Sequence, residues 1–97
     1  MLRHIVMIKF SDESTKEDVS AKVKKMLEEL PKQISELNRM EVGLNVNTKP
    51  SDFDLVLTSD FDDENGLNAY REHPEHQKVL DYLQSVMEKA TVVDYYL

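Results

Sequence analysis

The 97-residue sequence has no cysteine and no tryptophan, and it contains only two glycines, Gly43 and Gly66. Without cysteine, disulfides and thiolate metal sites are excluded. Two isolated glycines also exclude a glycine-rich phosphate-binding loop. No apolar run is long enough to cross a bilayer, and the apolar start of the chain carries Arg3 and Lys9 without a small-residue cleavage site, unlike a signal peptide. We therefore expect a cytoplasmic protein.

Basic residues are in the minority. Twelve lysines and arginines against nineteen aspartates and glutamates give a net charge of −7. Nucleic acids and anionic membranes are bound by neutralising phosphates, so neither is expected as a partner. The one basic cluster, residues 22–25, is followed by Glu28 and Glu29 and is typical of a solvated helix face. At this length, residues 1–97 are expected to form a single domain.

Hydrophobic periodicity predicts six main elements in the order β-α-β-β-α-β. The expected strands are residues 2–10, 40–46, 53–61 and 90–97. The first helix is expected over residues 14–37, with a kink or restart near Leu30 because Pro31 interrupts it. The second begins at Asp62 or Asp63 and breaks at Glu72, where Pro74 opens a new segment. This order predicts an α+β, ferredoxin-like protomer with a four-stranded antiparallel sheet and its helices on one face.

The sheet face turned away from the helices should be polar, but its predicted residues are largely apolar. They are Ile5, Met7, Val56, Val93 and Tyr95. Such a face needs a cover, and a second copy of the chain provides one. We therefore expect a homodimer in which two sheets pack into an α+β barrel. The alternative is a polar-rimmed face with a few isolated apolar residues.

Three histidines and a tyrosine are candidates for acid–base chemistry. At about 100° per residue, His76 falls on the apolar stripe of its helix and should face the sheet. His4 falls on the same side of its strand as the apolar residues Val6 and Ile8, which the helices are expected to cover, and Tyr70 lies one turn before His73. A neutral imidazole in apolar surroundings can act as a general base, and a tyrosine hydroxyl can stabilise an enolate oxygen.

Two other interpretations of these residues stay open. His73 can be the cap before Pro74, while His76 and Tyr70 are core residues satisfied by backbone carbonyls. The three histidines could also bind a divalent metal, although no acidic ligand is clearly placed with them, and neither a metal nor a cofactor is expected.

The segment Tyr70-Arg71-Glu72-His73-Pro74-Glu75-His76, together with strands 3–10 and 52–61, resembles the stress-responsive dimeric A/B barrel (Dabb) family. The resemblance spans nearly the whole chain. It implies a ferredoxin-like protomer and a barrel-forming homodimer. Family members include plant stress proteins, polyketide cyclases and bacterial proteins without an assigned reaction. The resemblance to the cyclases implies that His76 matches their base and Tyr70 its partner, and that His4 and His73 match further pocket histidines.

The chain departs from the cyclases at two pocket positions. Leu55 stands where they have a histidine on the third strand, and Met26 or Leu27 replaces a helix tyrosine. Cyclase activity is therefore not transferred. The expected ligand-binding residues are His4, Met26, Leu27, Leu55, Leu57, His73 and Val92.

Three functions are open at this point. The first is a homodimer that binds a small apolar or aromatic molecule between helices and sheet. The second is a cofactor-free, lyase-like enzyme that abstracts a proton next to a carbonyl, with His76 as base and Tyr70 as oxyanion donor. The third is a purely structural stress protein.

Overall fold

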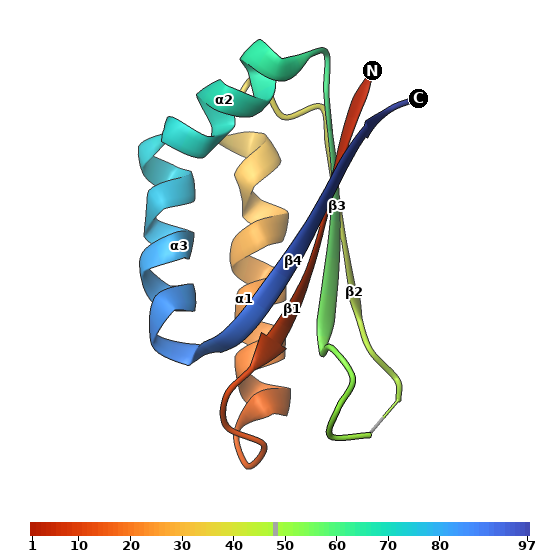
Figure 1. The fold of residues 1–97 in the computed structure, drawn as a ribbon. Helices are drawn as coiled ribbons and strands as arrows, with labels where there is room; N and C mark the ends of the chain where they lie inside the picture. The colour runs from red at the N-terminus through yellow and green to blue at the C-terminus, as the bar shows by residue number, and fades with distance from the viewer. Residues whose placement is uncertain (48) are drawn as a thin grey trace.

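A computed structural model describes residues 1–47 and 49–97. The elements are β1 (Leu2–Phe10), α1 (Lys16–Glu29), η1 (Leu30–Lys32), β2 (Arg39–Leu44), β3 (Leu55–Phe61), α2 (Glu64–Glu72), α3 (Pro74–Val86) and β4 (Met87–Tyr96). The strands form an antiparallel sheet in the order β2-β3-β1-β4, and the helices lie on one side of it (Figure 1). The predicted ferredoxin-like α+β class is confirmed.

The long N-terminal strand β1 lies inside the sheet, between β3 and β4. Val6 is level with Leu57 on β3 and with Val92 on β4, and His4 is level with Asp94. Because side chains alternate between the two faces of a strand, these five residues all point toward the helices. The register thus places an imidazole beside a carboxylate on the covered face.

The hydrophobic core lies between this face and the helices. It contains Leu2, Ile8 and Phe10 from β1, Val42 from β2, Leu55, Leu57 and Phe61 from β3, Val23, Leu27, Leu30, Ile34 and Leu37 from α1 and the chain after it, and Leu67, Tyr70, Val79 and Leu83 from α2 and α3. Burying each large apolar side chain stabilises the fold by about 1.5–3 kcal/mol before the entropy of ordering is counted. The apolar stripes of the helices are therefore buried against this face of the sheet.

The first helix is shorter than predicted. It ends at Glu29, and the expected break near Leu30 is present as the 3₁₀ turn η1, in which Pro31 occupies the opening turn. Proline cannot donate a backbone hydrogen bond, so the α-helical ladder stops there. Ile34 and Leu37 are buried as the periodicity required, but they belong to irregular chain, and the prediction of a helix through residue 37 was wrong.

The second helical region is built as predicted. Asp63 caps α2 by accepting a hydrogen bond from the Gly66 backbone N–H at 3.1 Å. The helix ends at Glu72, His73 has extended dihedrals, and Pro74 opens α3. The result is a corner in the chain between the two helices (Figure 1).

Strand ends differ from the prediction by a few residues. Strand β2 ends at Leu44, because Asn45 folds back: its Oδ1 accepts from the Asn47 N–H at 2.8 Å. Val46, placed in this strand by its alternation, is 97% exposed outside it. Strand β3 begins at Leu55, and β4 begins earlier than expected, at Met87.

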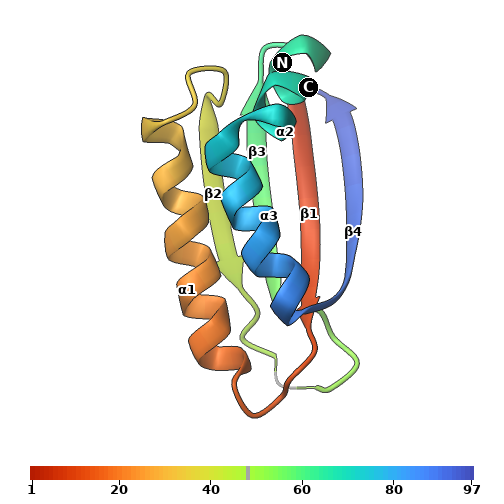
Figure 2. The same ribbon diagram turned by 90° about the vertical axis from the view of Figure 1, so that its left-hand side faces the viewer.

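The outer face of the sheet is uncovered. Met7, Val56, Val93 and Tyr95 are about two-fifths to three-fifths exposed, and Ile5 is half-buried. One end of this face is polar: there the Arg3 guanidinium donates to both carboxylate oxygens of Asp60 at 2.8 and 3.0 Å. Edge strand β4 lies beyond the helices, as Figure 2 shows, and every residue from Glu88 to Leu97 is exposed.

Across the described ranges, the helices are too short and too polar to span a membrane.

Candidate functional site

A cavity of about 300 Å³ lies between the helices and the sheet, beside strand β4. Most of its walls are apolar side chains: Val6, Ile8, Leu27, Leu57, Val79, Leu80, Leu83, Met87, Ala90 and Val92. The polar residues that reach it are His4, Tyr70, Arg71, His76 and Gln84. A mostly apolar cavity with a few polar groups is the usual form of a small-molecule site.

The corner between α2 and α3 brings Tyr70 and His76 together. Tyr70 lies in the last turn of α2 and His76 in the first turn of α3, and their ring centroids are 4.1 Å apart. The Tyr70 ring is held from behind by Phe61, at a centroid distance of 5.1 Å. Pro74 makes this contact possible, because a continuous helix would point residues 70 and 76 in different directions.

Burial sets the protonation states of both groups. It raises the pKa of the Tyr70 hydroxyl above its ordinary value, so this hydroxyl stays protonated and remains a hydrogen-bond donor. Desolvation by burial is also the largest influence on the pKa of His76 and lowers it below 6.5. The hydrogen bond to the Arg71 backbone acts in the opposite direction, and the nearby side chains of His4, Arg71 and His73 lower the pKa further. The His76 ring is therefore mostly neutral at neutral pH.

The tautomer of His76 follows from its hydrogen bond. The ring Nδ1 lies 3.3 Å from the backbone carbonyl oxygen of Arg71. A carbonyl can only accept, so Nδ1 carries the proton and Nε2 keeps its lone pair. This is the form of histidine that can accept a proton from a ligand.

A second imidazole at the cavity is held by a carboxylate. His4 Nδ1 donates to Asp94 Oδ1, and the other oxygen of Asp94 accepts from the Arg71 guanidinium at 3.5 Å. The two residues are 90 positions apart in sequence and meet only through the pairing of β1 with β4. The carboxylate fixes the tautomer of His4, and it leaves Nε2 as the unprotonated nitrogen when the ring is neutral.

Four of the predicted ligand-binding residues line this cavity: His4, Leu27, Leu57 and Val92. The two predicted catalytic residues, His76 and Tyr70, line it as well. The sequence analysis did not single out Arg71 or Asp94. The signal for Asp94 was its position two residues after Val92, because residues two apart on a strand share a face and both therefore lie on the helix side of β4.

Three predicted ligand-binding residues lie outside the cavity lining. His73 is the N-cap of α3, where its Nδ1 accepts from the Glu75 backbone N–H at 3.1 Å, so the capping interpretation holds for this histidine. Leu55 is the first residue of β3 and is packed in the core near the opposite end of the sheet from His4. Met26 packs against the edge of the core, because one helical step of about 100° turns it away from Leu27.

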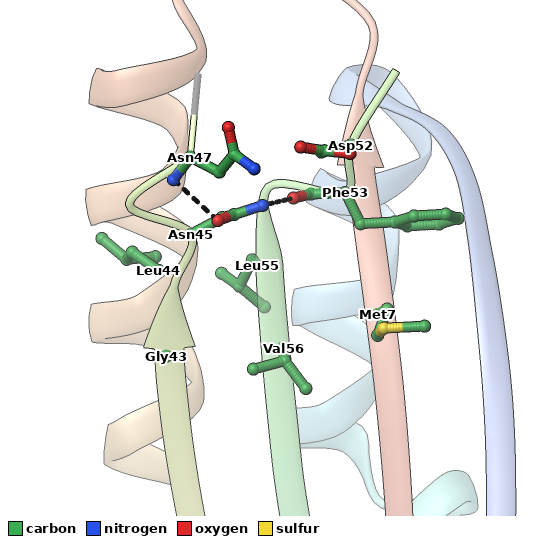
Figure 3. Close-up of a pocket in the computed structure, with 9 residues that line it drawn as sticks. All are labelled: Met7, Gly43, Leu44, Asn45, Asn47, Asp52, Phe53, Leu55 and Val56. Atoms are coloured by element: carbon green, nitrogen blue, oxygen red, sulfur yellow. Dashed lines mark hydrogen bonds between the residues drawn. The ribbon is translucent and has the colours of Figure 1, made fainter. Parts of the chain in front are cut away.

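A larger hollow, of about 460 Å³, lies on the outer face where β2 and β3 join their loop (Figure 3). Among its polar side chains, Asn45 donates to the Phe53 carbonyl at 2.6 Å and accepts from the Asn47 N–H, whereas Asp52 Oδ2 is buried without a hydrogen-bond partner among the described residues. Met7 and Val56, two predicted interface residues, form its apolar side. None of the described residues that line it is a histidine, so we do not assign the chemistry to this hollow.

No candidate metal centre is formed by the described part of the chain, where no three histidine, aspartate or glutamate side chains form a group that could hold an ion. The His4–Asp94 pair and His76 do not converge as a ligand set.

A family model and related protein sequences were both found to match this chain. Residues 2–97 match the family described as the stress responsive A/B barrel domain. An uncharacterized protein of Streptomyces coelicolor is 34% identical over 79 residues, which are 79% of this chain and 80% of that protein. The stress-response A/B barrel domain-containing protein DABB1 of Arabidopsis thaliana is 28% identical over 98% of this chain, which spans 46% of that protein.

Among solved structures, a dimeric protein of unknown function with a ferredoxin-like fold from Bacteroides fragilis is 34% identical. The match has a TM-score of 0.89 and covers 99% of this chain and 95% of that one. The sequence resemblance to the family is thus confirmed by sequence and by fold. The chain belongs to the stress responsive A/B barrel domain family.

Proposed function

We propose that the protein is a homodimer that binds a small apolar or aromatic molecule in the cavity between its helices and sheet. The observation that carries the proposal is the composition of this cavity. Ten apolar side chains enclose it, while two imidazoles and a phenol reach it from the chain corner and from β1. A purely structural role would have no use for a cavity of about 300 Å³, because voids of this size reduce stability.

The dimer is supported by the uncovered face and edge. Met7, Val56, Val93 and Tyr95 are exposed on the sheet face opposite the helices, where Met7 is level with Val56 and Ile5 is level with Val93. Contiguous apolar surface of this kind is typical of an interface, and the matching Bacteroides fragilis structure is described as dimeric. A two-fold arrangement of identical sheets would cover both copies at once.

Ligand binding is tested with benzylacetone, a neutral aryl ketone. In an NMR titration of the full chain, we expect its addition to shift the ring resonances of His4 and His76. Val92→Trp should weaken binding at least tenfold, because Val92 lines the cavity from the exposed edge strand and a larger side chain there fills it. Val46→Trp, at an exposed site outside the cavity, is the matched control and should leave binding unchanged. Equal affinity of both variants and the wild type would contradict this site.

Dimerisation is tested by sedimentation equilibrium. Ile5→Glu places a charge in the middle of the uncovered face and should give a folded monomer. Gln33→Glu adds the same charge at an exposed position on the helix side and should remain dimeric. A wild type that sediments as a monomer at micromolar concentration would refute the proposed assembly.

A second candidate function is abstraction of a proton next to a carbonyl. The contact between Tyr70 and His76 favours it, because it joins a neutral base to a permanently protonated donor. His76 Nε2 would take the proton from the carbon, and the Tyr70 hydroxyl would donate a hydrogen bond to the enolate oxygen. Both groups lie at the same cavity and need no cofactor for this step.

The enzyme proposal is tested by deuterium exchange. Benzylacetone incubated in deuterated buffer should exchange its acidic protons faster with protein than without, as followed by proton NMR. His76→Gln and Tyr70→Phe should each slow the exchange by about 100-fold or more if they act as base and donor. His73→Asn, a change at the helix cap, should not. A rate equal to buffer alone for the wild type, with the ketone bound, would leave binding as the function.

A further inference from the structure

The cavity has one permanently charged side chain. Among the described residues that line it, Arg71 is the one whose charge is permanent, since the charge of a histidine depends on protonation and Tyr70 stays protonated. The remaining walls are apolar apart from Gln84. A guanidinium at the boundary of an apolar cavity is complementary to a ligand with one negative group and an apolar body.

Arg71 is held loosely by its own protein. Its side chain donates to Asn68 Oδ1 and to Asp94 Oδ2, both at 3.5 Å, which is the outer limit of a hydrogen bond. About half of the side chain is exposed. A guanidinium has five N–H donors in a planar fork, so most of them remain available. A ligand carboxylate that accepts two of these donors would be held by shorter and stronger hydrogen bonds than those present.

Arg71 also lies between the cavity and a second hollow. It lines an adjacent, more open pocket of about 400 Å³ together with Glu64, Asn68 and Asp94. The carboxylates of this outer pocket are absent from the lining of the inner cavity. A ligand whose apolar body occupies the inner cavity would therefore present its polar end to Arg71, at the boundary of the two.

We propose that the cavity selects small aryl or alkyl carboxylic acids, with the carboxylate bound by the Arg71 guanidinium and the apolar body packed between helices and sheet. This inference rests on the proposed binding function and specifies its ligand class. The size is suitable, since a cavity of about 150 Å³ can hold a benzene ring and this one has about 300 Å³. A cationic ligand is disfavoured, because Asp94 already accepts hydrogen bonds from His4 and Arg71.

The experiment compares three probes of similar size and different charge: hydrocinnamate, hydrocinnamamide and phenylpropylamine. Dissociation constants are measured for the full chain by NMR, from the ring resonances of His4 and His76. The wild type should bind the acid roughly tenfold or more tightly than the amide, as expected for a charge-assisted hydrogen-bonded pair.

Substitutions then test the residue. Arg71→Gln should abolish the preference for the acid over the amide, while Arg71→Lys should retain part of this preference. Arg39→Gln is the matched control, since Arg39 is equally exposed and also pairs with an aspartate, but it does not line the cavity. It should keep the full preference, and the oligomeric state of each variant is verified by sedimentation.

Each of the other outcomes refutes a specific part of the proposal. Equal affinity of the wild type for acid and amide, or an acid preference that survives Arg71→Gln, refutes the role of Arg71 and leaves cavity binding intact. Tighter binding of the amine refutes it in favour of Asp94 as the recognition group. Absence of ring shifts with all three probes at millimolar concentration refutes the inference together with the proposed binding function.

Discussion

Substitution of Tyr70 by phenylalanine separates a functional hydroxyl from a structural ring. The ring is 1% exposed and packs between Phe61 and His76, whereas burial alone accounts for the raised pKa of its hydroxyl, with no hydrogen bond from a described residue to offset it. Tyr70 lines the cavity, and no hydrogen bond from its hydroxyl to a described residue would be broken by the substitution. We therefore expect removal of the hydroxyl to be neutral or to stabilise the fold by up to about 1 kcal/mol.

The effect on function should be opposite. A hydroxyl that donates to a ligand carbonyl contributes about 0.5–1.5 kcal/mol, so Tyr70→Phe should weaken benzylacetone binding by up to about tenfold. Tyr70→Ala also removes the ring and should cost about 3–5 kcal/mol of unfolding free energy. In a protein of this length, about 1 kcal/mol moves the melting temperature by about 4–8 °C.

The assay is thermal and urea unfolding at neutral pH and one fixed protein concentration, together with the ligand titration. Tyr82→Phe is the control, since Tyr82 packs beside Lys22 and does not line the cavity. It should leave ligand affinity unchanged. A loss of more than about 1.5 kcal/mol in Tyr70→Phe would show that the hydroxyl serves the fold, and unchanged affinity would show that it does not meet the ligand.

Three further predictions concern charge and capping. Because the folded-state pKa of His76 lies below 6.5, the stability that comes from its neutral form is complete above pH 6.5 and is lost as the pH falls through the lowered pKa. His76→Gln should therefore reduce the loss of unfolding free energy on the acid side, as measured by urea unfolding. The same loss in the variant and the wild type would contradict this prediction. Arg3 lowers the pKa of Asp60 below 3.8, so Asp60→Asn should cost about 2 kcal/mol at neutral pH. In urea unfolding this difference should shrink as the pH falls from 3.8 through the lowered pKa. His73→Ala should cost about 1 kcal/mol and His73→Asn much less, with ligand binding intact in both, because His73 acts as a cap.

Local patterns were sufficient for the elements and for part of the site. The alternation of β1 placed His4 on the covered face, and the proline at position 74 placed the corner that joins Tyr70 to His76. These signals act over a few residues, so they survive in any tertiary context. The same reasoning failed at Ile34 and Leu37, where burial keeps the helical period although the backbone has left the helix.

The hydrophobic pattern could not predict how far along a strand or helix the cavity-lining residues lie. Leu55 and Leu57 share a face of β3, yet only Leu57 lines the cavity, because two residues of a strand are separated by about 7 Å along it. Met26 and Leu27 are neighbours, and the packing of α1 on the sheet decides which of them reaches the cavity. Periodicity reports which side a residue faces, and it carries no information on what lies opposite.

By itself, the amino-acid sequence determined the order of strands and helices, the two apolar faces of the sheet and the family, because each depends on local spacing or on the motif around His73 and Pro74. Only the tertiary structure decided that Asp94 meets His4 and Arg71, since these residues come from β1, α2 and β4. The physical reason is strand register. The pairing of the first strand with the last sets which side chains are level, and a shift by one residue would turn Asp94 away from His4.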